Sequence, residues 1–192
     1  MAYPIYTTPG FVLSSYKIGE ADRLLQIFTR DLGVVFAKAT GIRKLKSKLR
    51  GHVQDYNLGL FSMVHGKSGW KLTNGDVYES GEYRSFSLRQ KEVLARVASL
   101  LRRLYVGEEP NEKLFETIIS FFSHEMFLKE DKIGVFELVV GVNILSQLGY
   151  VGDESITSNV VQMGHEIDSD FVLENKKKII LEINSALSDS QL

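Results

Sequence analysis

The fold is decided by residues 10–40, which read GFVLSSYKIGEADRLLQIFTRDLGVVFAKAT. Short runs rich in Val, Ile, Phe, Tyr and Thr alternate here with glycine-containing turns, the pattern of β-strands joined by hairpin loops. It predicts strands over residues 10–16, 23–29 and 33–40, with connections short enough for hairpins. The same pattern continues along the chain and predicts two more strands, over residues 53–64 and 70–79.

The connection between the third and fourth predicted strands is different from the others. It covers residues 41–52, is longer and basic, and could form a helical turn over residues 44–50. Five short antiparallel strands with one longer insertion at this point are typical of the OB-fold, a small Greek-key barrel. We therefore expect residues 1–80 to form an OB-fold domain.

The hydrophobic period changes to that of α-helices after Ser87. Residues 133–148 are apolar nearly all round, as expected for a central buried helix, and Gly149 could supply its left-handed C-terminal cap. The fold class predicted for the whole chain is therefore α+β, with the barrel of residues 1–80 followed by an all-helical domain of residues 81–192. The helices are expected from Ser87 onward and over residues 110–128, 133–148, 153–166 and 170–187.

Charge is distributed unevenly along the 192 residues, although the whole chain carries only −1. Residues 1–80 hold 11 Lys and Arg against 6 Asp and Glu, a net of +5, and residues 81–192 hold 12 against 18, a net of −6. Residues 32–54 contain no acid at all. Such a basic segment favours an anionic target such as nucleic-acid phosphates. The alternative is a charged loop that only aids solubility.

The candidate DNA-binding residues are the cations of this segment and two on neighbouring strands. A Lys-rich loop offers point charges to phosphates and predicts binding that does not depend on sequence. A structural ion pair is the competing interpretation for the two strand residues. The candidates are Arg43, Lys44, Lys46, Lys48 and Arg50 in the loop, with Arg23 and Lys38 on strands.

Aromatic residues of the barrel are candidate platforms for stacked bases, because OB-folds combine a basic groove with such platforms. Most must instead fill the interior of so small a barrel. We expect Trp70 and Tyr56 to be the exposed ones. The full set is Tyr16, Phe28, Phe36, Tyr56, Phe61, Trp70 and Tyr78.

Catalytic and metal-binding patterns are absent from the sequence. With no Cys there is no disulfide, no Cys-ligated zinc and no thiol catalysis. The four His are widely spaced, and the Asp residues of the first half are scattered over different turns, so a metal-dependent nuclease is a remote third alternative. No signal peptide or membrane-spanning stretch is found. We expect a cytoplasmic, nucleoid-associated protein without cofactor, metal or catalytic activity.

Several motifs in order along the chain resemble the bacterial recombination mediator family RecO. They are Gly10-Phe11-Val12-Leu13, Gly19-Glu20-Ala21-Asp22-Arg23, Phe28-Thr29-Arg30-Asp31-Leu32-Gly33, Thr40-Gly41-Ile42-Arg43-Lys44 and Ser47-Lys48-Leu49-Arg50-Gly51. A weaker likeness covers Phe136-Glu137-Leu138 and the later Leu145, Leu148, Gly149 and Tyr150.

The resemblance implies an OB-fold packed on a helical domain and a non-catalytic role in DNA repair. RecO proteins bind single- and double-stranded DNA, anneal complementary strands, and act with RecR to load RecA on strands covered by single-stranded-DNA-binding protein (SSB). The family's basic OB surface matches Arg43, Lys44, Lys48 and Arg50. Many members carry a Cys-x-x-Cys zinc site after the Leu-Gly-Tyr segment, where this chain has no Cys. The chain is also short for the family in the C-terminal region, so the resemblance implies binding of the SSB tail less strongly than binding of DNA.

A second functional hypothesis needs little DNA affinity. The helical domain would act as an adaptor that captures an acidic, apolar-ended peptide such as the SSB tail. Arg89, Arg96, Arg102 and Arg103 beside Leu101 and Tyr105 would form its pocket. Ordinary amphipathic helix surface is the simpler interpretation of these residues.

Overall fold

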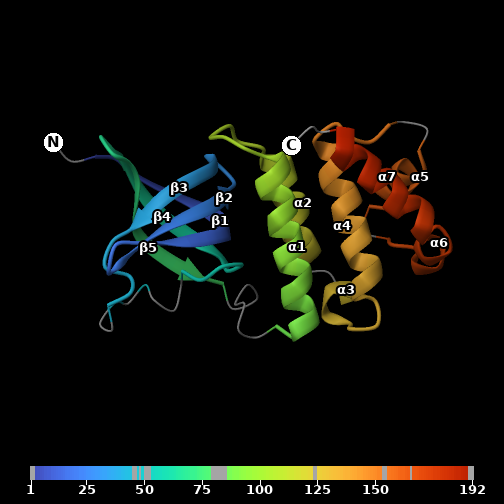
Figure 1. The fold of residues 1–192 in the computed structure, drawn as a ribbon, viewed down its shortest axis with the longest axis horizontal. Helices are drawn as coiled ribbons and strands as arrows, with labels where there is room; N and C mark the ends of the chain where they lie inside the picture. Colours follow the sequence, from blue (N-terminus) through green and yellow to red (C-terminus); the bar gives the residue numbers. More distant parts are fainter. Residues whose placement is uncertain are drawn as a thin grey trace. The chain divides into compact units, whose positions relative to one another are not determined.

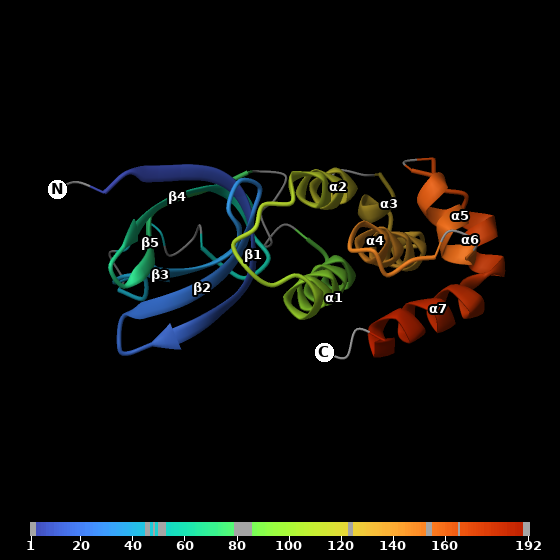
Figure 2. The ribbon, with the colours of Figure 1, turned by 90° about the horizontal axis from the view of Figure 1, so that it is seen from above.

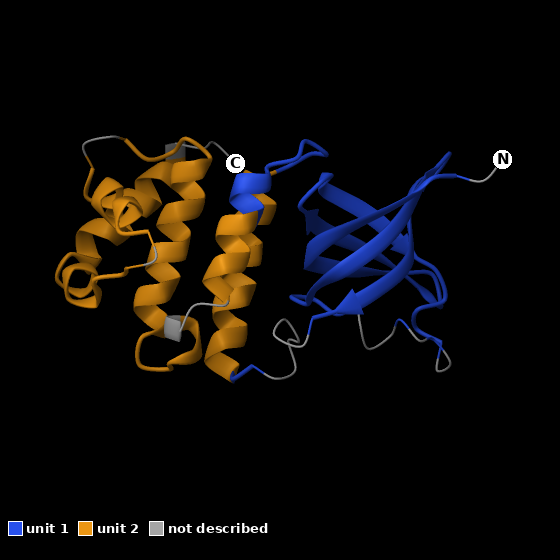
Figure 3. Cartoon of the chain, turned by 180° about the vertical axis from the view of Figure 1, so that it is seen from behind, with its two compact units in different colours: residues 1–87, 106–115 blue, residues 88–105, 116–192 orange. Residues whose placement is uncertain are grey.

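The computed structural model describes residues 3–44, 47, 49, 53–78, 86–122, 125–152, 155–164 and 166–189. The chain divides into two compact units, coloured separately in Figure 3. Unit 1 comprises residues 1–87 and 106–115, and unit 2 comprises residues 88–105 and 116–192. The two units are described one at a time below.

Unit 1 contains a closed five-stranded barrel (Figure 1). Its strands are β1 (Ile5–Ile18), β2 (Asp22–Thr29), β3 (Gly33–Ala39), β4 (Leu58–Gly66) and β5 (Gly69–Val77). They follow the order β1-β2-β3-β5-β4, and β4 closes onto β1. All neighbours are antiparallel except β3 and β5, which run parallel. The predicted OB-fold barrel, and with it the α+β class, is confirmed.

The barrel interior is filled by alternate residues of each strand, as the period of two requires. β2 contributes Leu25 and Ile27, and β3 contributes Val35, Ala37 and Ala39, all at most 1% exposed. Side chains from the other strands and from the β3–β4 connection complete this cluster: Val12, Ile42, Val53, Phe61, Met63, Trp70 and Leu72. Strand residues between these interior positions point outward, and those among them that stay exposed are available for binding.

Two strand starts differ from the sequence prediction by five residues each. β1 begins at Ile5 rather than residue 10, because Pro9 fits a strand position and its carbonyl accepts the Arg30 N–H at 3.0 Å. β4 begins at Leu58 rather than residue 53. Val53 donates to the Leu49 carbonyl in a turn, and Tyr56 has a left-handed φ of 70°, which a strand does not accommodate.

Residues 106–115 belong to unit 1 although they follow the first helix of unit 2. The Val34 N–H donates to the Gly107 carbonyl at 2.8 Å. The Phe115 ring packs on the Phe28 ring at a centroid distance of 5.3 Å. Residues 106–115, called here the return segment, thus cover Phe28, a buried aromatic residue of β2 that points out of the barrel.

Unit 2 is helical and is organised around its most apolar helix, α4 (Figure 2). Nine residues of α4 are buried along its length, which agrees with the predicted central helix. Gly149 follows it with φ +82°, as predicted for the cap. The helices are α1 (Leu88–Leu104), α2 (Glu112–Phe122), whose first four residues belong to unit 1, α3 (Glu125–Leu128), α4 (Ile133–Gln147), α5 (Ile156–Gln162), α6 (Ser169–Glu174) and α7 (Lys176–Asp189).

Two of the predicted helices are each divided in the structure. The prediction over residues 110–128 corresponds to α2 and α3, and that over residues 170–187 to α6 and α7. Asn175 separates the latter pair, since its side-chain and backbone N–H groups both donate to the Phe171 carbonyl and cap α6. None of the helices in the described part of the chain has the length and apolar character needed to cross a membrane.

Candidate nucleic-acid interface

A row of four outward residues crosses one face of the barrel. In the strand register, Tyr16 of β1 lies opposite Leu24 of β2, Leu24 lies opposite Lys38 of β3, and Lys38 lies opposite Lys71 of β5. Residues paired across strands share a face and their side chains are neighbours. Tyr16 is 50% exposed, and Lys38 and Lys71 are also exposed. The row thus places two neighbouring cations on the same face as an exposed aromatic ring, with Leu24 between the ring and Lys38.

A second row lies two residues further along the same face. Ser14, Gln26 and Phe36 are opposite one another, and the Ser14 hydroxyl donates to Gln26 Oε1 at 3.2 Å. Gln26 is 6% exposed, whereas Phe36 is 47% exposed. Neither row contains an acidic residue. We call these two rows of seven residues the outer face.

Asp22 connects the edge of this face to the start of the β3–β4 connection. Its Oδ1 accepts the Gly41 N–H at 2.8 Å, and its Oδ2 lies 3.0 Å from Lys38 Nζ. The Gly41 hydrogen bond, and after it the Lys38 ammonium, hold the pKa of Asp22 below its ordinary value, with a smaller contribution from the Lys44 charge. Asp22 is therefore a fixed anion among three structural partners.

Arg43 and Lys44, the first two cations of the basic loop, are placed by the turn between β1 and β2. The Arg43 N–H donates to the Ala21 carbonyl at 2.9 Å, and its Nη1 donates to the Gly19 carbonyl at 3.2 Å. The Lys44 N–H donates to the Gly41 carbonyl at 3.1 Å. Both side chains are exposed. Lys38 and Lys44 thus form a group of cations near Asp22, and Arg43 is held by the adjacent β1–β2 turn.

Arg23 does not join that group. It alternates with Asp22 and Leu24 along β2, so its side chain leaves from the opposite side of the strand. Its Nη1 donates to the Ser15 hydroxyl at 3.2 Å. The structural ion pair considered for Lys38 is thus present with Asp22, whereas the partner found for Arg23 is a hydroxyl.

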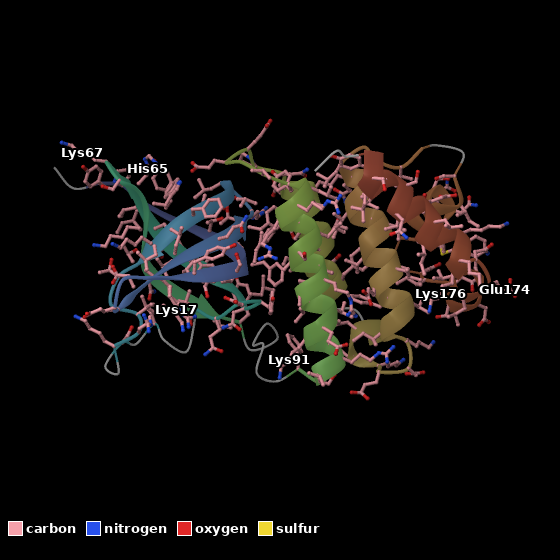
Figure 4. The ribbon with its side chains drawn as sticks, viewed as in Figure 1. Lys17, His65, Lys67, Lys91, Glu174 and Lys176 are labelled. Carbon is pink, nitrogen blue, oxygen red and sulfur yellow. The ribbon has the colours of Figure 1, made fainter. Side chains whose placement is uncertain are left out.

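The remaining loop candidates, Lys46, Lys48 and Arg50, lie outside the described residues. The expectation that Trp70 is exposed is wrong. Trp70 is 8% exposed and lies between the rings of Tyr6 and His65, at centroid distances of 5.3 and 4.8 Å. Tyr56 is half-buried. His65 and Lys67 lie at the β4–β5 hairpin (Figure 4).

Sequence reasoning missed Lys71 as a site residue. Lys71 joins the row through the parallel pairing of β3 with β5, which closes the barrel between strands distant in sequence. Local patterns contain no signal for that pairing. The signal that could have found it is the OB-fold topology itself, because its strand order places β5 beside β3.

Two of the four arginines of the adaptor hypothesis have partners inside unit 2. Arg96 forms a bidentate pair with Glu137, with Nη2 to Oε2 at 2.9 Å. Arg103 Nη2 donates to the Leu187 carbonyl at 2.8 Å. Leu101 is fully buried and cannot line an open pocket. A cavity of about 230 Å³ does lie between α1, α4 and α7, but Arg96 enters it already neutralised.

The chemistry offered by the outer face and the adjoining cations is that of binding. Ammonium and guanidinium groups bind anions, and exposed rings bind planar groups. Across the described ranges, no three His, Asp or Glu side chains are grouped so that they could hold a metal ion.

Comparison with known proteins identifies relatives of the barrel. Residues 1–80 match the family model described as Recombination protein O N terminal. A DNA repair protein RecO from Gloeothece citriformis is 33% identical over 113 residues, which are 59% of this chain and 40% of the relative. One from Rubrobacter xylanophilus is 27% identical over 146 residues, 76% of this chain and 58% of the relative. The chain thus spans about half the length of these relatives.

Proposed function

We propose that this chain is a non-catalytic DNA-binding protein of DNA repair and recombination, because residues 1–80 match the model for the N-terminal part of Recombination protein O and the relatives found are DNA repair proteins RecO. Its barrel holds DNA backbones without reading their sequence. The observation that carries this proposal is the set of exposed cations Lys38 and Lys71 on the outer face and Arg43 and Lys44 at the start of the β3–β4 connection, which Asp22 joins to that face.

Binding of this kind supports strand annealing. Two complementary strands repel each other through their phosphates, and cations that neutralise those phosphates reduce the repulsion. Lys and exposed Arg contact phosphates without a base preference, so either strand of any sequence is accepted. The protein then acts as a surface on which bases pair, and no turnover or cofactor is required.

The partners proposed for this chain are those of the family. We propose that it acts with RecR to load RecA on DNA covered by SSB, in the cytoplasm at the nucleoid. Contact with the SSB tail is the least supported of these partners, because Arg96 and Arg103 of unit 2 already have intramolecular partners.

The test is an annealing assay with fluorescently labelled complementary strands. The variant changes Arg43, Lys44, Lys46, Lys48 and Arg50 to Ala together. Neutralising five phosphates predicts a salt slope of about −3.5 for single strands, at about −0.7 per phosphate. We expect the variant to lose most of this slope and to anneal slowly.

The matched control changes Lys176, Lys177 and Lys178 of α7 to Ala, which removes exposed cations from unit 2. This control should bind and anneal like the unmodified protein. Salt-insensitive DNA binding by the unmodified protein, or full annealing by a folded five-residue variant, would refute the assignment.

A further inference from the structure

We infer that Tyr16 and Phe36 are base-stacking platforms that make the outer face selective for single-stranded DNA over duplex. This inference rests on the proposed DNA-binding function and adds the groups that contact bases. The sequence does not distinguish these two rings from the buried aromatic residues, whereas the structure leaves both exposed.

Three of the seven aromatic candidates of the barrel are buried. Phe28 and Phe61 are fully buried, and Trp70 is covered by its neighbours. Tyr16 and Phe36 are instead half exposed, at 50% and 47%. Tyr16 pairs with Leu24 of β2, and Phe36 pairs with Gln26, two residues further along the same strand. Both rings therefore stand on the same sheet surface. Shared exposure on one face distinguishes them from scattered surface aromatics.

The spacing suits two separate bases. Tyr16 and Phe36 are two strands apart and one outward position apart along the strands, which corresponds to about 12 Å in an ideal sheet. Stacked bases are separated by only about 3.4 Å, so the two rings cannot hold one base between them. Each ring offers its face to a different base.

The surroundings supply the backbone contacts that such bases require. Lys38 lies two strand positions from Phe36 and in the same row as Tyr16, and Lys71 continues that row. An unpaired strand can therefore place phosphates on the cations while its bases turn toward the rings. In a duplex the base faces are already stacked, so only the phosphate contacts remain.

The experiment measures binding of three labelled DNAs of equal length by fluorescence anisotropy: an oligothymidylate, an abasic single strand and a duplex. The protein is the full chain with both Tyr16→Ala and Phe36→Ala. Stacking on an aromatic side chain predicts a loss of about 5- to 150-fold per ring for oligothymidylate. Affinity for the abasic strand and duplex should stay unchanged, as should the salt slope.

Two controls separate stacking from general damage. Tyr3→Ala removes a ring of similar exposure, 51%, ahead of β1, and should not change binding. Tyr16→Phe with Phe36→Tyr keeps both rings and should retain affinity for oligothymidylate.

The outcomes distinguish this inference from the proposed function. If the double Ala variant binds oligothymidylate as tightly as the unmodified protein, stacking is refuted and phosphate binding stands. Equal losses for all three DNAs also refute stacking, because they indicate damage to the cationic site. If the unmodified protein binds none of the three DNAs, both the inference and the proposed function fail.

Discussion

Asp22 forms an ion pair with Lys38, with Oδ2 and Nζ 3.0 Å apart, at the edge of the proposed DNA-binding surface. The carboxylate occupies the position beside a lysine that a phosphate would take. Since the Lys38 side chain is 49% exposed, solvent and other anions can still reach it. DNA binding therefore competes with an internal anion, and this competition can be measured.

Removal of that anion should strengthen DNA binding. In Asp22→Asn the side-chain oxygen can still accept the Gly41 N–H, but Lys38 loses its charged partner. Because an exposed ion pair is weak, the affinity should rise only modestly, by up to about fivefold. The single-strand salt slope should steepen by about 0.7. Glu20→Gln in the neighbouring turn is the control for overall charge, and an equal effect there would contradict the role of the pair.

Unit 2 should become less stable in acid because of Glu182. Its carboxylate accepts hydrogen bonds from Ile156 N–H, Thr157 N–H and the Thr157 hydroxyl at 3.2, 3.1 and 2.8 Å. Burial alone would raise the pKa of Glu182, but these hydrogen bonds outweigh it and the pKa is lowered. The stabilisation is therefore present above the unfolded pKa of about 4.3 and is lost as pH falls through the folded pKa.

Thermal unfolding followed by circular dichroism at neutral and acidic pH tests this prediction. Glu182→Gln keeps one acceptor oxygen but loses the charge, and should destabilise unit 2 at neutral pH by about 0.5–1.5 kcal/mol, the usual net contribution of one hydrogen bond. It should also weaken the pH dependence. Glu174, labelled in Figure 4, is exposed, and Glu174→Gln serves as the control. Identical pH profiles for the Glu182 variant and the unmodified protein would contradict the prediction.

Gly33 should tolerate no side chain. It has φ +68°, and an added Cβ would lie 2.6 Å from the Glu109 carbonyl oxygen and 2.8 Å from the Gly107 carbonyl oxygen. Gly69 also has a positive φ, +91°, but a Cβ there meets nothing within 4 Å. Gly69→Ala should cost about 1–2 kcal/mol from conformation alone. Gly33→Ala should lower the free energy of unfolding clearly more, as measured by a urea titration. Equal losses of stability in the two variants would contradict this prediction, because they would show that residues 106–115 move away from the added Cβ at little cost.

Phe115 should stabilise the barrel from outside its interior. Phe115 is 2% exposed and contacts the fully buried Phe28. Phe115→Ala should destabilise unit 1 by about 3–5 kcal/mol, the usual cost of such a truncation. Trp70 is the single Trp of the chain and lies in the barrel core, so its emission reports unfolding of unit 1. Phe115→Leu should cost less, and an unchanged Trp70 transition in the Ala variant would contradict this role.

The sequence predicted the elements better than their ends. The strands β2 and β3 were predicted within about one residue, because alternation of apolar and polar residues is a local signal. The predicted start of β4 was wrong because Val53 is an apolar residue that enters the core from a turn. Composition does not distinguish such a residue from a strand residue.

Sequence alone determined the barrel, the helical half and the concentration of positive charge before residue 54, since strand periodicity, helix periodicity and residue charge are written along the chain. Tertiary structure decided which groups share a surface. Barrel closure set Lys71 beside Lys38, and packing buried Trp70 while leaving Tyr16 and Phe36 exposed. These choices depend on pairings between distant strands, where competition for the limited interior of a small barrel, rather than residue type, decides which rings are covered.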